Sequence, residues 1–315
     1  MFRKYDQNVR KAIKKGVYNP DAEHDACGIG FVANIKNIKT NNIVQDGLSI
    51  LKNLTHRGAV GADPRAGDGC GILTQMPDKF LRKVAIENNI ELPAEGHYGV
   101  GNLFLPKNST KRNSYLSKIR EIVEDENLTI LGLRDIPVNN QGLGYSVKPS
   151  EPSHIQIFIS SNKNDLEQDD LERKLYVLRK RIYNIFLGGV NSPIEDFYMC
   201  SLSSRTLLYK GLLLSDQLSD YFLDLNDTDF ESALALVHQR FSTNTFPTWS
   251  LAQPFRMICH NGEINTLKGN VNWLKARLAT LKSDLLGDDL KKIWPIVVDG
   301  QSDSASFDNV LELLV

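Results

Sequence analysis

Hydrophobic and polar positions along the chain follow two periods, which together predict an ordered series of strands and helices. A short apolar run bounded by turn residues predicts a strand, whereas apolar residues at three- and four-residue spacing predict a helix. GIGFVANI (28–35) therefore predicts a buried strand, and the apolar positions from Val44 to Leu54 predict a helix with one buried face. Further strands are predicted at 72–76, 98–105, 128–136, 154–160, 197–203 and 206–214, and further helices at 111–124 and 165–186.

The last third of the chain combines two predicted strands and two predicted helices with several polar residues. The first strand ends in His238, Gln239 and Arg240, and strand alternation places His238 and Arg240 on one face. FRMICH (255–260) predicts a second strand that runs into Asn261-Gly262, and a helix follows. Ser and Asp caps then precede an apolar helical run in which the chain stops, so we expect a domain that is incomplete at its C-terminus.

The order of these elements favours an α+β fold, because strands and helices interleave without a regular βαβ period. The 315 residues are 41% hydrophobic and 24% charged, which is ordinary for a soluble globular protein. The net charge of −1 gives no basic field for nucleic acid or an anionic membrane, and no apolar run approaches the length of a membrane span. Residues 1–26 are polar and charged without the apolar core of a secretory signal.

The cysteines are scattered, and this distribution limits the chemistry they can support. None of the four forms a CxxC pair, which argues against a local zinc or iron–sulfur motif and favours a reducing, cytoplasmic location. They are Cys27, Cys70, Cys200 and Cys259. Cys27 differs from the others because it lies at the boundary between the polar leader and the first apolar strand.

Several glycine motifs have a purely structural interpretation that competes with a functional one. Gly28-Ile29-Gly30 opens a strand and has no third glycine, so we reject a dinucleotide fingerprint. RGAVGADPRAGDGCG (57–71) lacks a following GK[ST] and precedes a strand, which favours a conformationally demanding loop over a phosphate cradle. Taken alone, Asn261-Gly262 is typical of a plain hairpin turn.

Two catalytic arrangements are open for Cys27. One is a papain-like pair with His24, His56, His238 or His260 as the base, and the local pattern selects none of the four. The other follows if the chain is cut after Ala26, because Cys27 then gains a free α-amine. An α-amine has a reference pKa of about 7.7–8.0, so part of it is neutral at pH 7 and can accept the thiol proton.

Four ordered blocks of the sequence resemble a known family. They are CGIGF after the leader, LTHRGAVGADPRAGDGCGIL, HQRFSTNTFPTWSLAQPFRMICHNGEINT and DGQSDSASFDNVLELL. In this order they resemble the amino-terminal glutaminase domain of the glutamate synthase large chain, a class II glutamine amidotransferase. The resemblance implies an αββα sandwich of the N-terminal-nucleophile hydrolase type over residues 27–315, with residues 1–26 as a propeptide removed on maturation.

The resemblance also implies roles for individual residues. Cys27 matches the nucleophile, and Arg57 matches an arginine beside it that would favour the thiolate. Asn261 and Gly262 match the oxyanion hole, in which a side-chain amide and a backbone N–H face the tetrahedral oxygen. Cys70 departs from the pattern, since alanine is expected there.

The implied substrate is L-glutamine. Arg240 matches the residue that binds its α-carboxylate, where a bidentate guanidinium suits the two oxygens. Thr243 lies in the same segment and would add a hydroxyl contact, and Asp303 matches the carboxylate that recognises the α-ammonium group.

The implied reaction is hydrolysis of glutamine to glutamate and ammonia through a thioester on Cys27. In a complete synthase, the ammonia reaches 2-oxoglutarate at a site with FMN and an iron–sulfur cluster, and a small electron-transfer subunit is a further partner. The resemblance places these cofactors in downstream domains, so we expect no cofactor or metal in this chain. The alternatives are another class II amidotransferase with a different ammonia acceptor and a non-catalytic regulatory remnant.

Overall fold

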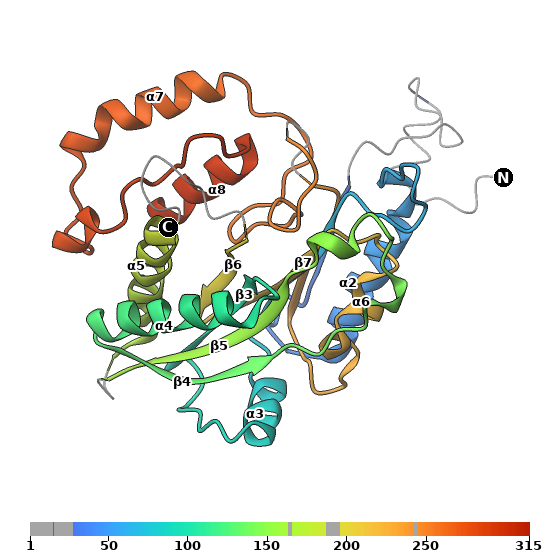
Figure 1. The fold of residues 1–315 in the computed structure, drawn as a ribbon, viewed down its shortest axis with the longest axis horizontal. Helices are drawn as coiled ribbons and strands as arrows, with labels where there is room; N and C mark the ends of the chain where they lie inside the picture. The colour runs from blue at the N-terminus through green and yellow to red at the C-terminus, as the bar shows by residue number, and fades with distance from the viewer. Residues whose placement is uncertain (1–14, 16–27, 163–165, 187–195, 242–244) are drawn as a thin grey trace.

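A computed structural model shows two four-stranded antiparallel sheets packed face to face between layers of helices (Figure 1). The structure describes residue 15 and residues 28–162, 166–186, 196–241 and 245–315. One sheet has the strand order β1-β8-β2-β7, and the other has the order β4-β5-β3-β6. The four-layer αββα arrangement predicted for the chain is therefore confirmed.

The first sheet consists of β1 (Ile29–Ala33), β8 (Leu234–Gln239), β2 (Cys70–Gln75) and β7 (Thr206–Gly211). Helix α2 (Asn41–Asn53) lies against its outer face and buries Val44, Leu48 and Leu51. The approach is close at Gly47, where an added Cβ would lie 2.6 Å from the Cβ of Ala235 on β8. Helices α3 (Asp78–Glu87) and α6 (Leu218–Tyr221) contribute apolar residues to the same buried cluster as α2.

The second sheet consists of β4 (Leu128–Asp135), β5 (Ser153–Ser161), β3 (Tyr98–Leu105) and β6 (Tyr198–Ser203), covered by α4 (Ser109–Asp125) and α5 (Gln168–Phe186). Alternation along β3 divides the core between the two faces. Val100 and Phe104 join the cluster shared with the first sheet, whereas Leu103 and Leu105 pack with α4 and α5. Across the inner layer, the Nδ2 of Asn102 donates to the carbonyl of Leu208 on β7 at 3.0 Å.

The C-terminal part of the chain packs on α5. Helix α7 (Leu267–Arg277) leads through short 3-10 turns to α8 (Asp303–Leu314). Residues Ile293, Ile296 and Val297, which precede α8, form a small buried cluster with Val177 of α5. The Oγ of Ser302 caps α8 by accepting a hydrogen bond from the N–H of Ala305.

Most predicted elements are confirmed, but two predictions are wrong. Residues 255–260 form no strand, because side chains rather than a neighbouring strand take up much of their backbone hydrogen bonding. Strand β1 is not buried: it lies at a sheet edge and pairs with β8, and Phe31 is 69% exposed. Helix α3 was not predicted, although Phe80, Leu81 and Val84 follow a helical period.

Candidate active site

Four strands from different parts of the sequence begin or end along one edge of the first sheet, the edge that runs across the strand ends. The start of β1 pairs with the end of β8, where Ile29 lies opposite His238. Cys70 at the start of β2 lies opposite Gln239 on one side and Gly211 at the end of β7 on the other. Loops that leave these ends therefore meet at the same edge, which is where an active site can combine residues distant in sequence.

Gly28, the residue after the predicted nucleophile, is buried at this edge. Its carbonyl accepts a hydrogen bond from the N–H of Gln239 at 2.8 Å. A Cβ added to Gly28 would lie 2.6 Å from the carbonyl oxygen of Gln239 and 3.3 Å from the Oδ1 of Asn261. Only glycine allows this close approach, which brings the start of β1 beside the predicted oxyanion residue. Cys27 and Thr243 lie outside the described residues.

Arg240 follows the end of β8 and is fixed by four contacts. Its N–H donates to the carbonyl of Gly69 at 2.8 Å, and its carbonyl accepts from the N–H of Gln253 at 3.2 Å and contacts the Nδ1 of His238 at 3.1 Å. Its Nε donates to the Oδ2 of Asp68 at 2.9 Å. No described residue accepts a hydrogen bond from either Nη atom, so the outer edge of the guanidinium can receive a carboxylate.

Asp68 holds the arginine from a largely buried position. Burial raises the pKa of the Asp68 carboxyl, and the hydrogen bond and charge of Arg240 act against this rise. Neighbouring Gly69 has a φ of 120°, which favours glycine. The glycine-rich loop therefore orients an arginine, and its predicted conformational demand is confirmed at Gly69.

The segment that carries Asn261 and Gly262 is held from two sides. On one side, the amide of Gln253 pairs with both backbone groups of His260: its Oε1 accepts from the N–H and its Nε2 donates to the carbonyl, each at 2.8 Å. On the other side, the Oδ2 of Asp303 accepts from the N–H of Ile264 at 2.7 Å. The predicted oxyanion pair therefore lies between two fixed points.

Asp303 is the first residue of α8, and only 3% of it is exposed. Its Oδ1 accepts from the N–H of Ser304 at 2.6 Å, and the Oγ of Ser304 contacts the Nδ1 of His260 at 3.2 Å. Arg57 ends a 3-10 turn, and a Cβ on the following Gly58 would lie 2.5 Å from the Nε2 of Gln239. The segments carrying all five predicted residues that the structure describes thus reach this edge or the loops connected to it.

The other cysteines and the histidines differ in their suitability for catalysis. Burial raises the pKa of Cys70 well above its ordinary value and that of Cys200 to about 12, so neither supplies a thiolate at neutral pH. Cys70 is fully buried in β2. Burial lowers the pKa of His238 to about 4, and His56 is exposed on its turn.

Sequence reasoning missed Asp68, Gln253 and Ser304, which hold Arg240 and His260. Asp68 lies in the glycine-rich segment 57–71, but nothing in the spacing of that segment indicated Arg240 as its partner. A separate cavity of about 860 Å³ contains none of the predicted site residues. Its walls include residues of β3, α5, β6 and α8 and of the segments 149–152, 247–251 and 255–256.

Comparison with known proteins identifies the family. The sequence pattern of the class-II glutamine amidotransferases matches residues 27–315. The chain is 46% identical over 301 residues to the glutamate synthase [NADPH] large chain of Bacillus subtilis, covering 96% of this chain and 19% of the relative. It is 43% identical to the glutamate synthase [NADH] of Saccharomyces cerevisiae (96% and 14%) and 40% identical to the ferredoxin-dependent glutamate synthase 2 of Synechocystis (93% and 18%).

The chain therefore belongs to the class-II glutamine amidotransferases. It spans less than a fifth of the length of these three glutamate synthases. Among the described residues, no helix is long and apolar enough to cross a membrane, and no group of three or more His, Cys, Asp or Glu side chains could hold a metal ion.

Proposed function

We propose that this chain is the glutaminase part of a glutamate synthase and hydrolyses L-glutamine to glutamate and ammonia. The observation that carries the proposal is the convergence of Gly28, Arg240 and Asn261 at one sheet edge of a class-II glutamine amidotransferase fold. A nucleophile on residue 27 would adjoin both a carboxylate-binding arginine and an oxyanion donor. Such a set suits acyl transfer from an amide.

The proposed reaction begins after residues 1–26 are removed. The Cys27 Sγ attacks the side-chain amide carbon of glutamine, and the thiol proton passes to the α-amine of Cys27. The Asn261 amide and the Gly262 N–H would stabilise the oxyanion, and Arg57 would favour the thiolate. The C–N bond breaks as the α-ammonium returns its proton to the leaving ammonia. Water then cleaves the thioester to give glutamate and the free thiol.

Substrate recognition falls to the groups around the reacting centre. The Nη atoms of Arg240 would bind the α-carboxylate, and Thr243 would add a hydroxyl contact. Asp303 would accept from the α-ammonium while one of its oxygens holds the N–H of Ile264. The family match starts at Cys27, which supports residues 1–26 as a propeptide and residues 27–315 as the glutaminase domain.

The later steps of a synthase would use parts outside this chain. There, FMN would supply the reduction of the product formed from ammonia and 2-oxoglutarate, and cysteine thiolates would hold an iron–sulfur cluster. Cys70 and Cys200 are fully buried, and among the described residues no group of three or more His, Cys, Asp or Glu side chains could hold a metal ion. The three relatives carry NADPH, NADH or ferredoxin in their names, and the electron donor here would be one of this class. We place the protein in the cytoplasm.

The test is ammonia release from glutamine by the processed protein, compared between Cys27→Ala and Cys70→Ala. The Cys27 variant should lose turnover but still bind glutamine, because Arg240 and Asp303 hold the α-carbon groups. The Cys70 variant is the matched control and should keep its activity, since its thiol is buried in β2. Ammonia release by the Cys27 variant, or by wild-type protein that retains residues 1–26, would refute the proposed mechanism.

A further inference from the structure

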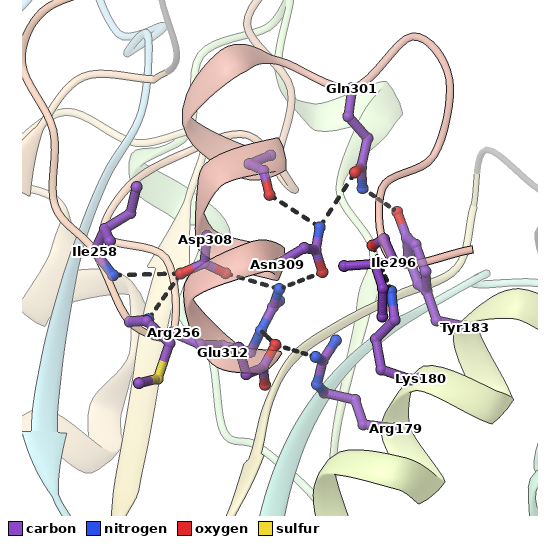
Figure 2. A network of polar contacts seen from close by, with 12 residues as sticks. Arg179, Lys180, Tyr183, Arg256, Ile258, Ile296, Gln301, Asp308, Asn309 and Glu312 are labelled. Atoms are coloured by element: carbon purple, nitrogen blue, oxygen red, sulfur yellow. Dashed lines mark hydrogen bonds and ion pairs between the residues drawn. The ribbon is translucent and has the colours of Figure 1, made fainter. Parts of the chain in front are cut away.

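Helix α8 contacts the segment before and after Asn261 and Gly262. At its first residue, the Asp303 carboxylate accepts from the N–H of Ile264. Further along, the Oδ1 of Asp308 accepts from the N–H of Met257 at 2.7 Å and from the N–H of Ile258 at 3.3 Å (Figure 2). Two carboxylates on one helix therefore fix residues 257–264, which we call the oxyanion segment, at both ends.

Asp308 takes over a role that a neighbouring strand would otherwise have. Residues 255–260 were predicted as a strand, and their N–H groups would then pair with backbone carbonyls. Instead, the Asp308 side chain, which is fully buried, accepts from two consecutive N–H groups. A carboxylate makes stronger hydrogen bonds to N–H groups than a neutral acceptor does, so this contact fixes an irregular backbone firmly.

A balanced set of charges holds Asp308 in place. The Nη2 of Arg256 lies 2.7 Å from its Oδ2, and the Nε of Arg256 donates to the Oε2 of Glu312 at 3.1 Å. Arg179 of α5 pairs with the same Glu312 oxygen (Figure 2). Two arginines and two carboxylates thus compensate one another away from water, which a buried charge requires.

Further hydrogen bonds connect α8 and the residues before it to α5. The Nδ2 of Asn309 donates to the Oε1 of Gln301, whose Nε2 donates to the hydroxyl of Tyr183 on α5, both at 3.1 Å (Figure 2). The Nζ of Lys180, also on α5, donates to the carbonyl of Ile296 at 2.7 Å. Helix α8 is therefore fixed to the second sheet's helical layer, and Asp308 extends that support to the oxyanion segment.

We infer that Asp308 is a positioning residue, which holds the backbone before Asn261 and Gly262 so that both donors meet the developing oxyanion. This inference rests on the proposed glutaminase function and adds a residue to it. Asp308 bonds to Met257, Ile258 and Arg256, and among the described residues it has no hydrogen bond or ion pair with Arg240 or Asp303, which are assigned to glutamine. Its loss should therefore act on kcat, which depends on donor placement in the transition state, more than on KM.

The experiment compares three changes at one position in the processed, full chain. Asp308→Ala removes the acceptor and the charge, and kcat should fall by about 10²-fold, as for the loss of one oxyanion donor. Asp308→Asn keeps an oxygen acceptor but loses the ion pair, and it should keep much more of kcat than the alanine variant. Asp308→Glu keeps the charge but displaces the acceptor by one methylene, and its kcat should fall below that of the asparagine variant.

Arg179→Gln is the matched control, because it weakens the same charge network without touching the oxyanion segment. It should lower thermal stability yet leave kcat close to that of the wild type. Amide hydrogen exchange over residues 257–264 gives a readout that needs no activity. Exchange there should accelerate in Asp308→Ala, and in Asp308→Glu if the alanine variant does not fold, but not in Arg179→Gln.

The outcomes distinguish a failure of the proposed function from a failure of the inference about Asp308. A wild-type protein that releases no ammonia refutes the proposed function, while the exchange data still decide whether Asp308 holds the segment. An active wild type with equal losses of kcat in the glutamate, asparagine and Arg179 variants would overturn the inference, because those losses would follow the ion pairs. Unchanged exchange in both the alanine and glutamate variants would also overturn it.

Discussion

Arg240 combines backbone strain with a proposed role in binding glutamine. Its φ of 127° is a conformation that residues other than glycine rarely adopt, at a cost of order 1–3 kcal/mol. The N–H bond to Gly69, the carbonyl contacts with Gln253 and His238 and the Nε bond to Asp68 compensate for this cost. They hold the guanidinium by its Nε, and no described residue accepts a hydrogen bond from either Nη atom.

This geometry predicts the effect of Asp68→Asn. Hydrogen bonds to charged groups contribute about 1.5–3 kcal/mol, so a weaker hold on Arg240 should raise KM for glutamine about tenfold or more. The kcat value should change less, because the proposed contact of Arg240 with the α-carboxylate would be made in the ground and transition states alike. Steady-state ammonia release at varied glutamine concentration measures both constants.

Asp63→Asn is the control for this change. Asp63 lies in the same loop, and its carboxylate accepts from the N–H and Oγ of Ser146 rather than from Arg240. Its replacement should affect the loop's stability but leave KM unaltered. An unchanged KM in Asp68→Asn would show that Arg240 is oriented without its carboxylate partner.

Among the elements, helix α2 packs closely against β8 of the first sheet at Gly47. Gly47→Ala would place a methyl group 2.6 Å from Ala235, and this overpacking costs about 1–3 kcal/mol. Alanine gains up to about 1 kcal/mol in helix propensity, which is less than the expected cost. The free energy of unfolding should therefore fall, as measured by urea denaturation.

Gly61→Ala provides the opposite expectation. A Cβ at this position has no neighbour within 4 Å, and its φ is not positive. The substitution should be neutral or stabilising by about 0.4–1 kcal/mol, because alanine restricts the unfolded chain. A destabilised Gly61 variant alongside a neutral Gly47 variant would contradict the packing argument for α2.

Elements with a strong period were predictable from the sequence, because a local pattern carries their signal. Strand β3 has the same bounds as its prediction, 98–105, and α2 differs by a few residues. The exposure of β1 was not predictable, because an edge position depends on the order of strands. The strand predicted at 255–260 was wrong for a related reason. Asp308, some fifty residues away in sequence, accepts hydrogen bonds from two of its N–H groups, and no local pattern indicates this contact.

In the candidate site, too, local motifs were predictable and long-range contacts were not. Cys27, Arg240, Asn261 and Asp303 came from motifs that resemble a family, and their roles stay predictions. Their supporting contacts, such as Gln253 on His260, join positions whose spacing has no period. Polar side chains that hold loops have many alternative partners, and only the fold decides between them.

In the whole molecule, four buried basic groups each contribute a stability term that depends on pH in one direction. Burial lowers the pKa of His154 to about 3 and of His238 to about 4, and it lowers the pKa of Lys180 and Lys210 to about 7. Each group binds its proton more readily in the unfolded chain, where the ordinary values are about 6.5 and 10.4. The contribution of these four groups to stability should therefore rise with pH through both windows, from about 4 to 6.5 and from about 7 to 10.

The acidic window can be assigned to a residue by replacing His154 with phenylalanine. The imidazole lies among the rings of Phe104, Phe222 and Trp249, so a phenyl ring should fit, although it loses the 2.8 Å contact with the hydroxyl of Tyr221. Below pH 6.5 the unfolded wild type gains a proton that folded His154 does not bind. This difference is worth up to about 1.4 kcal/mol per pH unit.

Urea denaturation between pH 5 and 7.5 should thus show a shallower slope for His154→Phe, whereas His97→Gln, at an exposed position, should keep the wild-type slope. Parallel profiles for the phenylalanine variant and the wild type would mean that His154 titrates alike in the folded and unfolded states.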